Sequence, residues 1–388
     1  MDTNASAPLG CQSDLFDIDP DILYLNAASK SVMLRASVEA GQVGAAAKGR
    51  PWTIDEETRL NEAEEIRTRF AGLIGATGED IAIHPAASYG IATAANHLNP
   101  EAGARILVIE GQFPSNVYAW RKLADRTGAE IYTVPWPEDG DWTSSVLAAI
   151  DERLAVAALP PCHWTDGARL DLVQIGAAVK DVGATFLVDA TQWVGAVPID
   201  VHAIKADYLV CAAYKWLLGP YGLSFMYAAP DRQYGQALED HLYNHGGVAS
   251  ITTGLSYPDA FTPGARRYDA GEYLNLMSLP MILAALKQID AWRPKRIAAY
   301  LGPLTEAMTE VCVTLGLDPV PADVRSPHIL GVRRKGGFPA DFAARLAHHG
   351  VHTSARGGAM RLSPYLFNTT DDAERLGKAI ESVRESAT

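Results

Sequence analysis

The feature that most restricts the fold of this chain is a series of short, continuously apolar segments. Such runs, rich in β-branched residues, occur at 105–111, 130–135, 154–161, 185–191, 207–214 and 223–229. Between runs, apolar residues recur every three or four positions, as they do in 58–74 and 171–183. Strands that are buried on both faces are continuously apolar, and intervening helices favour parallel pairing. The sequence therefore predicts an α/β fold with a mainly parallel sheet sandwiched by helices.

The sequence pattern changes near residue 278, which predicts a second, smaller domain. The segment "SLPMILAALKQIDAW" (278–292) has the apolar content of a long linking helix. Two short strands (327–334 and 359–364) and an amphipathic helix from Thr370 follow it, which indicates a small α/β unit. We therefore expect an N-terminal segment that joins the small domain (1–29), a large domain (30–277), and a linking helix with the small C-terminal domain (278–388).

Composition excludes several classes of partner. The 388 residues carry a net charge of −13, without a stripe of Lys and Arg interleaved with aromatic residues, so we expect neither nucleic acid nor an anionic membrane as a partner. No apolar run is long enough to span a bilayer, and no basic start precedes an apolar signal core. The four scattered cysteines lack zinc-ligand spacing. We expect a soluble, cytoplasmic protein without a metal.

Ligands of open α/β sheets bind beyond the carboxyl ends of the strands, and polar residues follow several strands here. In "IAIHPAASYG" a strand ends near His84 and a helix starts near Ser88. The unpaired N–H groups of Ala87, Ser88 and Tyr89 at that helix start could hold a phosphate. The alternative is that Ser88 only caps the helix.

Two further strand ends carry charged residues. Asp189 ends the run "TFLVD", where a buried carboxylate needs a cation or several hydrogen bonds, unless it serves only as a helix cap. Lys215 follows the next strand, in "CAAYKWLLGPYG", between Tyr214 and Trp216. Desolvation by such neighbours lowers the pKa of a lysine and makes its amine a nucleophile. A lysine amine, a carboxylate and a phosphate cradle are what pyridoxal 5′-phosphate (PLP) requires.

At these residues the chain resembles the class V aminotransferase family of fold-type I PLP-dependent enzymes. This family includes cysteine desulfurases and proteins similar to isopenicillin-N epimerase, selenocysteine lyase and kynureninase. The resemblance extends from "LYLNAASKSVM" to "RLSPYLFNTTDDAERL" and is most specific in "VDATQWVG" and "ADYLVCAAYKWLLGPYG". It implies a homodimer with active sites at the interface and an amino-acid substrate.

The resemblance also implies roles for individual residues. Lys215 would carry PLP as a Schiff base, Asp189 would pair with the pyridine nitrogen, and Gln192 would hydrogen-bond the ring hydroxyl. Phe113, in "EGQFPSNVYAW", would stack on the ring, and Tyr214 would donate to the phosphate.

For the substrate, Arg361 in "RLSP" matches the arginine that binds the carboxylate in the family. Asn26 is expected to bind the substrate too. Arg356 is expected to contact a second acidic group of the substrate, or else to be a solvated loop residue.

The chain departs from the family pattern at several positions. Ala212 and Tyr214 replace a Ser and a His before the lysine, and Glu272 stands where many relatives have a Thr that reaches the phosphate across the dimer interface. The Asn that desulfurases carry before Gly167 is absent, so that Trp164 or His163 is expected to form that wall.

No cysteine follows Cys312, although desulfurases present a nucleophilic cysteine shortly before the substrate arginine. This absence argues against a persulfide-forming desulfurase. We expect a lyase acting on a cysteine-derived or other β-substituted amino acid. The alternatives are an aminotransferase, an epimerase, and a PLP-binding protein without turnover. Without GxGxxG, GxxxxGK[ST] or HExxH, nothing favours a nicotinamide, nucleotide or metal enzyme.

Overall fold

Strands between residues 81 and 228 form a seven-stranded sheet in the computed structural model, which describes residues 7–247, 252 and 254–385. The strand order is β2-β8-β7-β6-β5-β3-β4, and only β8 runs antiparallel to its neighbours. The predicted mainly parallel α/β architecture is confirmed. Its strands are β2 (Ile81–His84), β3 (Arg105–Ile109), β4 (Glu130–Val134), β5 (Leu154–Leu159), β6 (Thr185–Asp189), β7 (Tyr208–Ala212) and β8 (Ser224–Ala228).

Helices cover both faces of this sheet, as continuously apolar strands require. Alternate residues of β3 show the two faces, since Leu107 and Ile109 belong to one buried cluster and Ile106 and Val108 to the other. The first cluster includes residues of α2 (Glu56–Ile74), α5 (Trp142–Ala149), α6 (Leu172–Asp181) and α9 (Ser278–Trp292). The second includes residues of α3 (Ala87–His97) and α4 (Ser115–Thr127). Two further helices are α1 (Arg35–Lys48), which packs on α9, and the short α7 (Leu242–His245).

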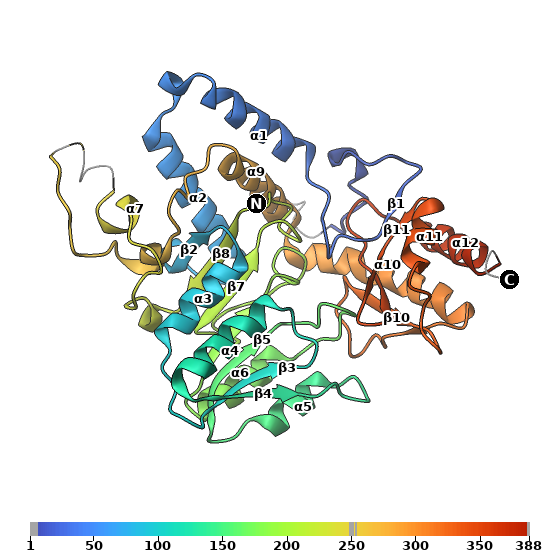
Figure 1. Ribbon diagram of the computed structural model, residues 1–388. Helices are drawn as coiled ribbons and strands as arrows, with labels where there is room; N and C mark the ends of the chain where they lie inside the picture. Colours follow the sequence, from blue (N-terminus) through green and yellow to red (C-terminus); the bar gives the residue numbers. More distant parts are fainter. Residues whose placement is uncertain (1–6, 248–251, 253, 386–388) are drawn as a thin grey trace.

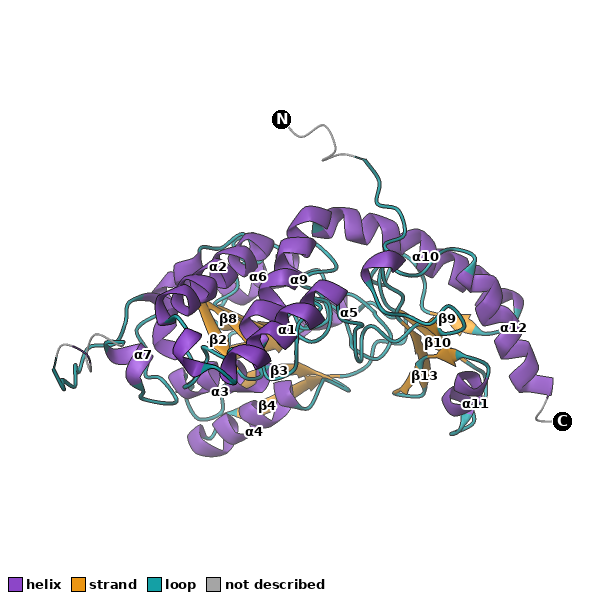
Figure 2. Cartoon of the chain, turned by 90° about the horizontal axis from the view of Figure 1, so that it is seen from above, coloured by secondary structure: helices purple, strands orange, loops and turns teal. Residues whose placement is uncertain are grey.

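The C-terminal part of the chain builds a second, smaller sheet. Its strands have the order β12-β13-β10-β9, and they are β9 (Asp318–Pro319), β10 (Leu330–Arg333), β12 (Ser354–Arg356) and β13 (Ala359–Leu362). The helices of this part are α10 (Pro294–Thr314), α11 (Phe342–His348) and α12 (Asp372–Glu385). Figure 1 shows this orange and red part at one end of the molecule, and in Figure 2 α10 lies beside β9 and β10.

The N-terminal segment lies against the C-terminal part. Strand β1 (Leu23–Tyr24) pairs in parallel with β11 (Val351–His352), and the backbone of Asn26 bridges to Ser363. These contacts bring the beginning of the chain beside the loops at the carboxyl ends of the large sheet. Within the described residues, no helix is both long and apolar enough to cross a bilayer.

Candidate active site

A cavity of about 220 Å³ opens at the carboxyl ends of the central strands, and it collects several of the predicted residues. Segments that follow β2, β3, β5, β6 and β7 form its walls, as expected for an open α/β sheet. Among the predicted residues, those that line it are Ala87, Ser88, Phe113, Asp189, Gln192, Tyr214 and Lys215.

Lys215 lies three residues beyond β7 and is only 6% exposed. Its Nζ lies 5.3 Å from the ring centre of Phe113 and 5.6 Å from that of Tyr214. Burial lowers the pKa of Lys215 to about 8; the charge of Asp189 acts in the opposite direction, and that of Arg361 in the same one. An amine with this pKa is partly neutral near physiological pH, and is therefore a usable nucleophile.

Asp189 ends β6, the strand beside β7, and is buried. Its Oδ1 accepts a hydrogen bond from the N–H of Thr191 at 3.2 Å, and no ion pair to it occurs within the described residues. Burial raises the pKa of Asp189, while Thr191 and the charge of Lys215 act to lower it. The carboxylate therefore lies in the cavity wall without a cation in contact, a costly arrangement that a cationic ligand would relieve.

Gln192 is held from two sides. Its Nε2 donates to the carbonyl oxygen of Ala28 at 2.9 Å, and its Oε1 accepts from the indole N–H of Trp216 at 2.8 Å. The carbonyl oxygen of Gln192 is paired with Nε2 of His328 at 2.6 Å. This network fixes the side chain beside the lysine and leaves one N–H of the Gln192 amide for a ligand.

The helix α3 points its N-terminus at the cavity. The helix begins at Ala87, and its N-cap, Ala86, provides no side-chain hydrogen bond, so that Ser88 is not the cap. Ala87 and Ser88 line the cavity with amides that have no acceptor within a helix. Tyr89 does not line it: its N–H donates to the carbonyl of Ala86, and its ring packs on His84.

Aromatic side chains form the remaining walls. Phe113 meets Trp164 edge to face at 5.4 Å, and Trp164 donates from its indole N–H to the carbonyl of Gly111 at 2.8 Å. Trp164 thus forms the wall that the sequence assigned to Trp164 or His163, since the His163 ring stacks on Trp142 instead. Tyr214 stacks on the exposed Tyr221 with ring centres 4.3 Å apart.

The three predicted substrate-binding residues lie outside the cavity lining. Arg361 is 1% exposed, and its Nη1 donates to the carbonyl oxygen of Trp164 at 2.7 Å, which puts the guanidinium in the adjoining wall. Burial, with a smaller contribution from the charge of Arg356, lowers the pKa of Arg361 to about 9. Arg356 is partly exposed on β12. Asn26 has a buried Oδ1 with no hydrogen-bond partner within the described residues.

Sequence reasoning missed several residues that line the cavity. Gln112 accepts the N–H of Phe113 through its Oε1, while its buried Nε2 has no partner among the described residues. Ser115, Thr191 and Tyr221 also contribute. No local sequence pattern marked these residues, because loops that are far apart in sequence bring them together.

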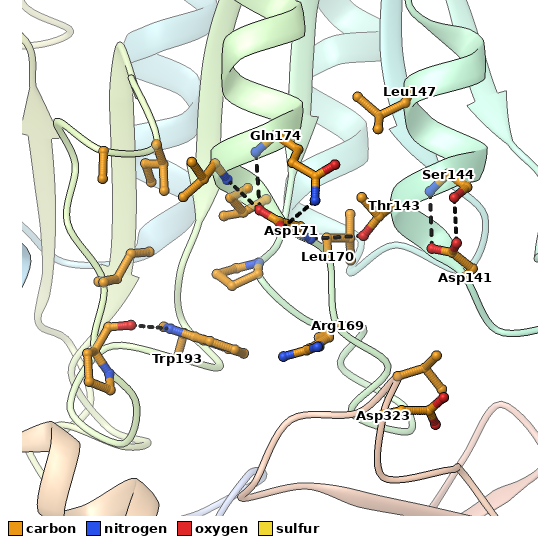
Figure 3. A pocket seen from close by; sticks show the side chains of 18 of the residues that line it. Asp141, Thr143, Ser144, Leu147, Arg169, Leu170, Asp171, Gln174, Trp193 and Asp323 are labelled. Carbon is orange, nitrogen blue, oxygen red and sulfur yellow. Dashed lines mark hydrogen bonds between the residues drawn. The ribbon is translucent and has the colours of Figure 1, made fainter.

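A larger cavity of about 720 Å³ lies elsewhere, between α5, α6 and the loop around Asp323. Figure 3 shows that its polar groups largely bond one another: Asp171 accepts from Gln174, and Asp141 accepts from Ser144. It contains neither Lys215 nor any other predicted site residue, so the smaller cavity is the candidate active site.

Solved structures share this fold over nearly the entire chain. The apo structure of cysteine desulfurase from Thermococcus onnurineus NA1 matches with a TM-score of 0.82 and 19% identity, covering 98% of this chain and 100% of that one. The complex between the cystine C-S lyase C-DES and its reaction product cysteine persulfide matches with a TM-score of 0.80 and 15% identity, covering 93% and 97%. The chain therefore has the fold of these enzymes.

Sequence comparison defines the family. A probable cysteine desulfurase from Methanothermobacter thermautotrophicus is 26% identical over 386 residues, covering 94% of this chain and 95% of that protein. The family model described as aminotransferase class-V matches residues 45–376, and the chain belongs to this family. The resemblance recognised in the sequence is thereby confirmed.

Proposed function

We propose that the cavity binds PLP and that the protein is a PLP-dependent enzyme acting at Cα or Cβ of an α-amino acid. The single observation that carries this proposal is the pair of buried, uncompensated groups Asp189 and Lys215 at neighbouring strand ends. A cationic ring nitrogen would pair with the Asp189 carboxylate, and an aldehyde would take the Lys215 amine. The free amides of Ala87 and Ser88 offer hydrogen bonds and the positive end of a helix dipole to a phosphate. The residues present thus fit the cofactor.

The surrounding residues have roles that follow from their contacts. Lys215 would hold the cofactor and, once released, would serve as general base at the substrate Cα. Phe113 would cover a ring face, Gln192 would donate to the ring hydroxyl, and Tyr214 would donate to the phosphate. When bound, PLP supplies an electron sink for the electrons released at Cα.

Substrate binding is assigned to Arg361. Its buried Nε has no partner in the described structure, and its recorded hydrogen bond goes to a carbonyl. A buried guanidinium without an anion is unfavourable, and an incoming α-carboxylate would complete its hydrogen bonds in a bidentate pair. Such a carboxylate would compete with the carbonyl of Trp164 for Nη1. Asn26, whose Oδ1 is buried and unpaired, is a further proposed substrate contact.

The proposed reaction is that of a lyase on a cysteine-derived or other β-substituted amino acid. The names of the related desulfurase and C-S lyase support sulfur-containing substrates. A persulfide on the protein is not part of the proposal: Cys162, a cysteine in the cavity lining, is fully buried, and burial raises its pKa to about 12. A thiol with that pKa is protonated at neutral pH and is a poor nucleophile. Bond cleavage would therefore occur on the substrate alone.

Amino transfer is the second candidate, and membership in the aminotransferase class-V family favours it. Both reactions would begin with removal of the Cα proton by Lys215; in a lyase the substituent at Cβ would then leave with its bonding electrons, whereas in amino transfer Lys215 would return the proton at an atom other than Cα. A homodimer with sites at the interface and a cytoplasmic location complete the proposal.

The first test identifies the lysine that binds the cofactor. The purified protein is loaded with PLP, reduced with borohydride and digested, and mass spectrometry should find a pyridoxyl group on Lys215. Lys215→Ala should abolish the visible absorbance of the bound cofactor, while Lys122→Ala, at an exposed position of α4, should leave it unchanged. An unchanged spectrum in Lys215→Ala would refute the proposed site.

The second test separates the reactions. The PLP-loaded enzyme is incubated with single L-amino acids without a keto-acid acceptor. The released cofactor is then identified by mass spectrometry. Pyridoxamine phosphate would identify an aminotransferase. PLP together with accumulating pyruvate or alanine would identify a lyase, and an inverted amino acid would identify an epimerase.

A further inference from the structure

The hairpin β12–β13 carries two arginines on one face. Its antiparallel register pairs Ser354 with Arg361 and Arg356 with Ala359. Residues two apart on a strand point to the same side, so Arg356 lies on the side of Ser354 and hence of Arg361. Diagonal neighbours on one face of such a pair are within reach of long side chains. The two guanidinium groups are therefore held near each other by backbone pairing.

The turn of this hairpin rests on a wall segment of the cavity. Gly357 and Gly358 have φ angles of +52° and +77°, values that a tight two-residue hairpin turn requires. A Cβ on Gly357 would lie 3.4 Å from Cγ2 of Thr165, the residue after Trp164. Because Arg361 also donates to the carbonyl of Trp164, the hairpin contacts this segment at two points.

Neither arginine is neutralised. Within the described residues, no carboxylate lies within ion-pair distance of Arg356 or Arg361, and the recorded hydrogen bonds of both go to backbone carbonyls. Arg333 on the neighbouring strand β10, by contrast, contacts Asp166 at 3.0 Å. Two adjacent positive charges without a counter-ion, one of them buried, create a strong potential for an anion.

Arg361 interacts electrostatically both with Arg356 and with Lys215. The charge of Arg356 contributes, after burial, to the lowered pKa of Arg361, and the charge of Arg361 contributes to the lowered pKa of Lys215. The anion that the hairpin attracts would thus be bound beside the reacting amine.

We propose that Arg356 is a specificity-determining residue that binds a second acidic group of the substrate. The substrate class is an α-amino acid whose side chain carries a carboxylate or a sulfinate close to Cα. This inference rests on the proposed function, in which Arg361 binds the α-carboxylate. Arg361 and Arg356 would then share one dianionic ligand, each through the planar fork of its guanidinium.

The binding test uses unreactive probes of matched shape. Succinate carries two carboxylates, and succinamate replaces one of them with an amide. Calorimetry on the PLP-loaded wild type should give a succinate dissociation constant lower than that of succinamate by about tenfold or more, the range for one partly solvated charge pair. Arg356→Gln should remove most of this preference and leave succinamate binding within about twofold.

A matched variant controls for charge alone. Arg334→Gln removes one exposed arginine of the same small domain and should retain the wild-type preference. Equal binding of both probes to the wild type, or an unchanged preference in Arg356→Gln, would overturn the inference. If Arg356→Gln bound neither succinate nor succinamate, the inference would also be overturned, because that result would indicate damage to the site and no role of Arg356 in specificity.

Turnover experiments distinguish a carboxylate from a sulfinate as the second acidic group of the substrate. With wild-type enzyme, L-aspartate should be bound or converted in preference to L-asparagine if the group is a carboxylate, and L-cysteine sulfinate in preference to L-cysteine if it is a sulfinate. In either case the preference should fall in Arg356→Gln. A preference for L-asparagine over L-aspartate and for L-cysteine over L-cysteine sulfinate would overturn the inference. The proposed function would remain intact. Failure to label Lys215 with borohydride would instead refute the proposed function, whatever the probes show.

Discussion

At the scale of single residues, the chemistry depends on a charged amine placed where water is scarce. Lys215 is flanked by Phe113 and Tyr214, and burial in this aromatic surrounding is the largest cause of its lowered pKa. Asp189 moderates the effect, because its negative charge stabilises the ammonium form. The two residues therefore set the pH at which the amine becomes reactive.

This balance predicts the pH dependence of cofactor capture. Only the neutral amine attacks an aldehyde, and the pKa of Lys215 in the cofactor-free protein is about 8. The rate at which stripped protein takes up PLP, followed by stopped-flow absorbance, should rise with pH and level off above about pH 9, one unit past the pKa. Asp189→Asn removes the charge that raises this pKa, so the midpoint should move below that of the wild type. A rate still rising at about pH 10, as for a solvated lysine, would contradict the burial effect.

The positions of Lys215 and Asp189 could be predicted from sequence because both follow continuously apolar strands. The predicted run 185–191 contains β6, and 207–214 contains β7, each ending within two residues of the observed strand. Gln112 and Tyr221 could not be assigned to the site, because loops far apart in sequence bring them together and no local pattern encodes that contact.

At the scale of elements, the sequence predicted strands better than helices. The bounds of α9 match the helix predicted over 278–292, but the following helix α10 was not predicted. Pro294 stands at its first turn, where proline is tolerated, but Pro303 lies inside the helix and weakens a helical pattern. Strand β13 lies within the strand predicted over 359–364, but its hairpin partner β12, only three residues long, was not predicted.

One buried ion pair joins the elements that lead into the site. Arg67 on α2 makes two hydrogen bonds to Asp269, at 2.6 and 3.0 Å, and also donates to the carbonyl of Ile81 at 2.6 Å. Asp269 in turn accepts the N–H of Ile83 at 2.8 Å. The pair therefore holds β2 in place. The end of β2 leads into α3, the helix whose N-terminus points at the cavity.

Removing one partner should be costly for the fold. Arg67→Met leaves Asp269 buried without its cation, and urea unfolding should show a loss of about 3–5 kcal/mol in the free energy of unfolding. Arg69→Met, on the same helix, removes two partly exposed ion pairs, with Glu65 and Asp290, and should cost at most about 2 kcal/mol. Equal losses in the free energy of unfolding for the two variants would show that burial does not make the loss of the Arg67 pair more costly.

At the scale of the whole molecule, the most exposed of the large apolar side chains lie in two stretches of the sequence. Those exposed by 71% to 89% are Val43, Trp52, Tyr234, Leu255 and Tyr257. Contiguous apolar surface marks contact with another protein, and we infer that these side chains contribute to the interface of the proposed homodimer. Val43 and Trp52 precede α2, whereas Tyr234, Leu255 and Tyr257 lie between β8 and α9.

The homodimer is therefore expected to depend on these side chains. Sedimentation equilibrium of the wild type should give twice the chain mass of 41.7 kDa. Trp52→Lys would place a charge in an apolar contact and should shift the population toward the single-chain mass. Val313→Lys, at an exposed apolar position on α10 in the small domain, should not change the mass and serves as the matched control. A wild type of single-chain mass, still binding PLP at Lys215, would show that the cavity is complete in one chain, because no second subunit would then be required for the phosphate.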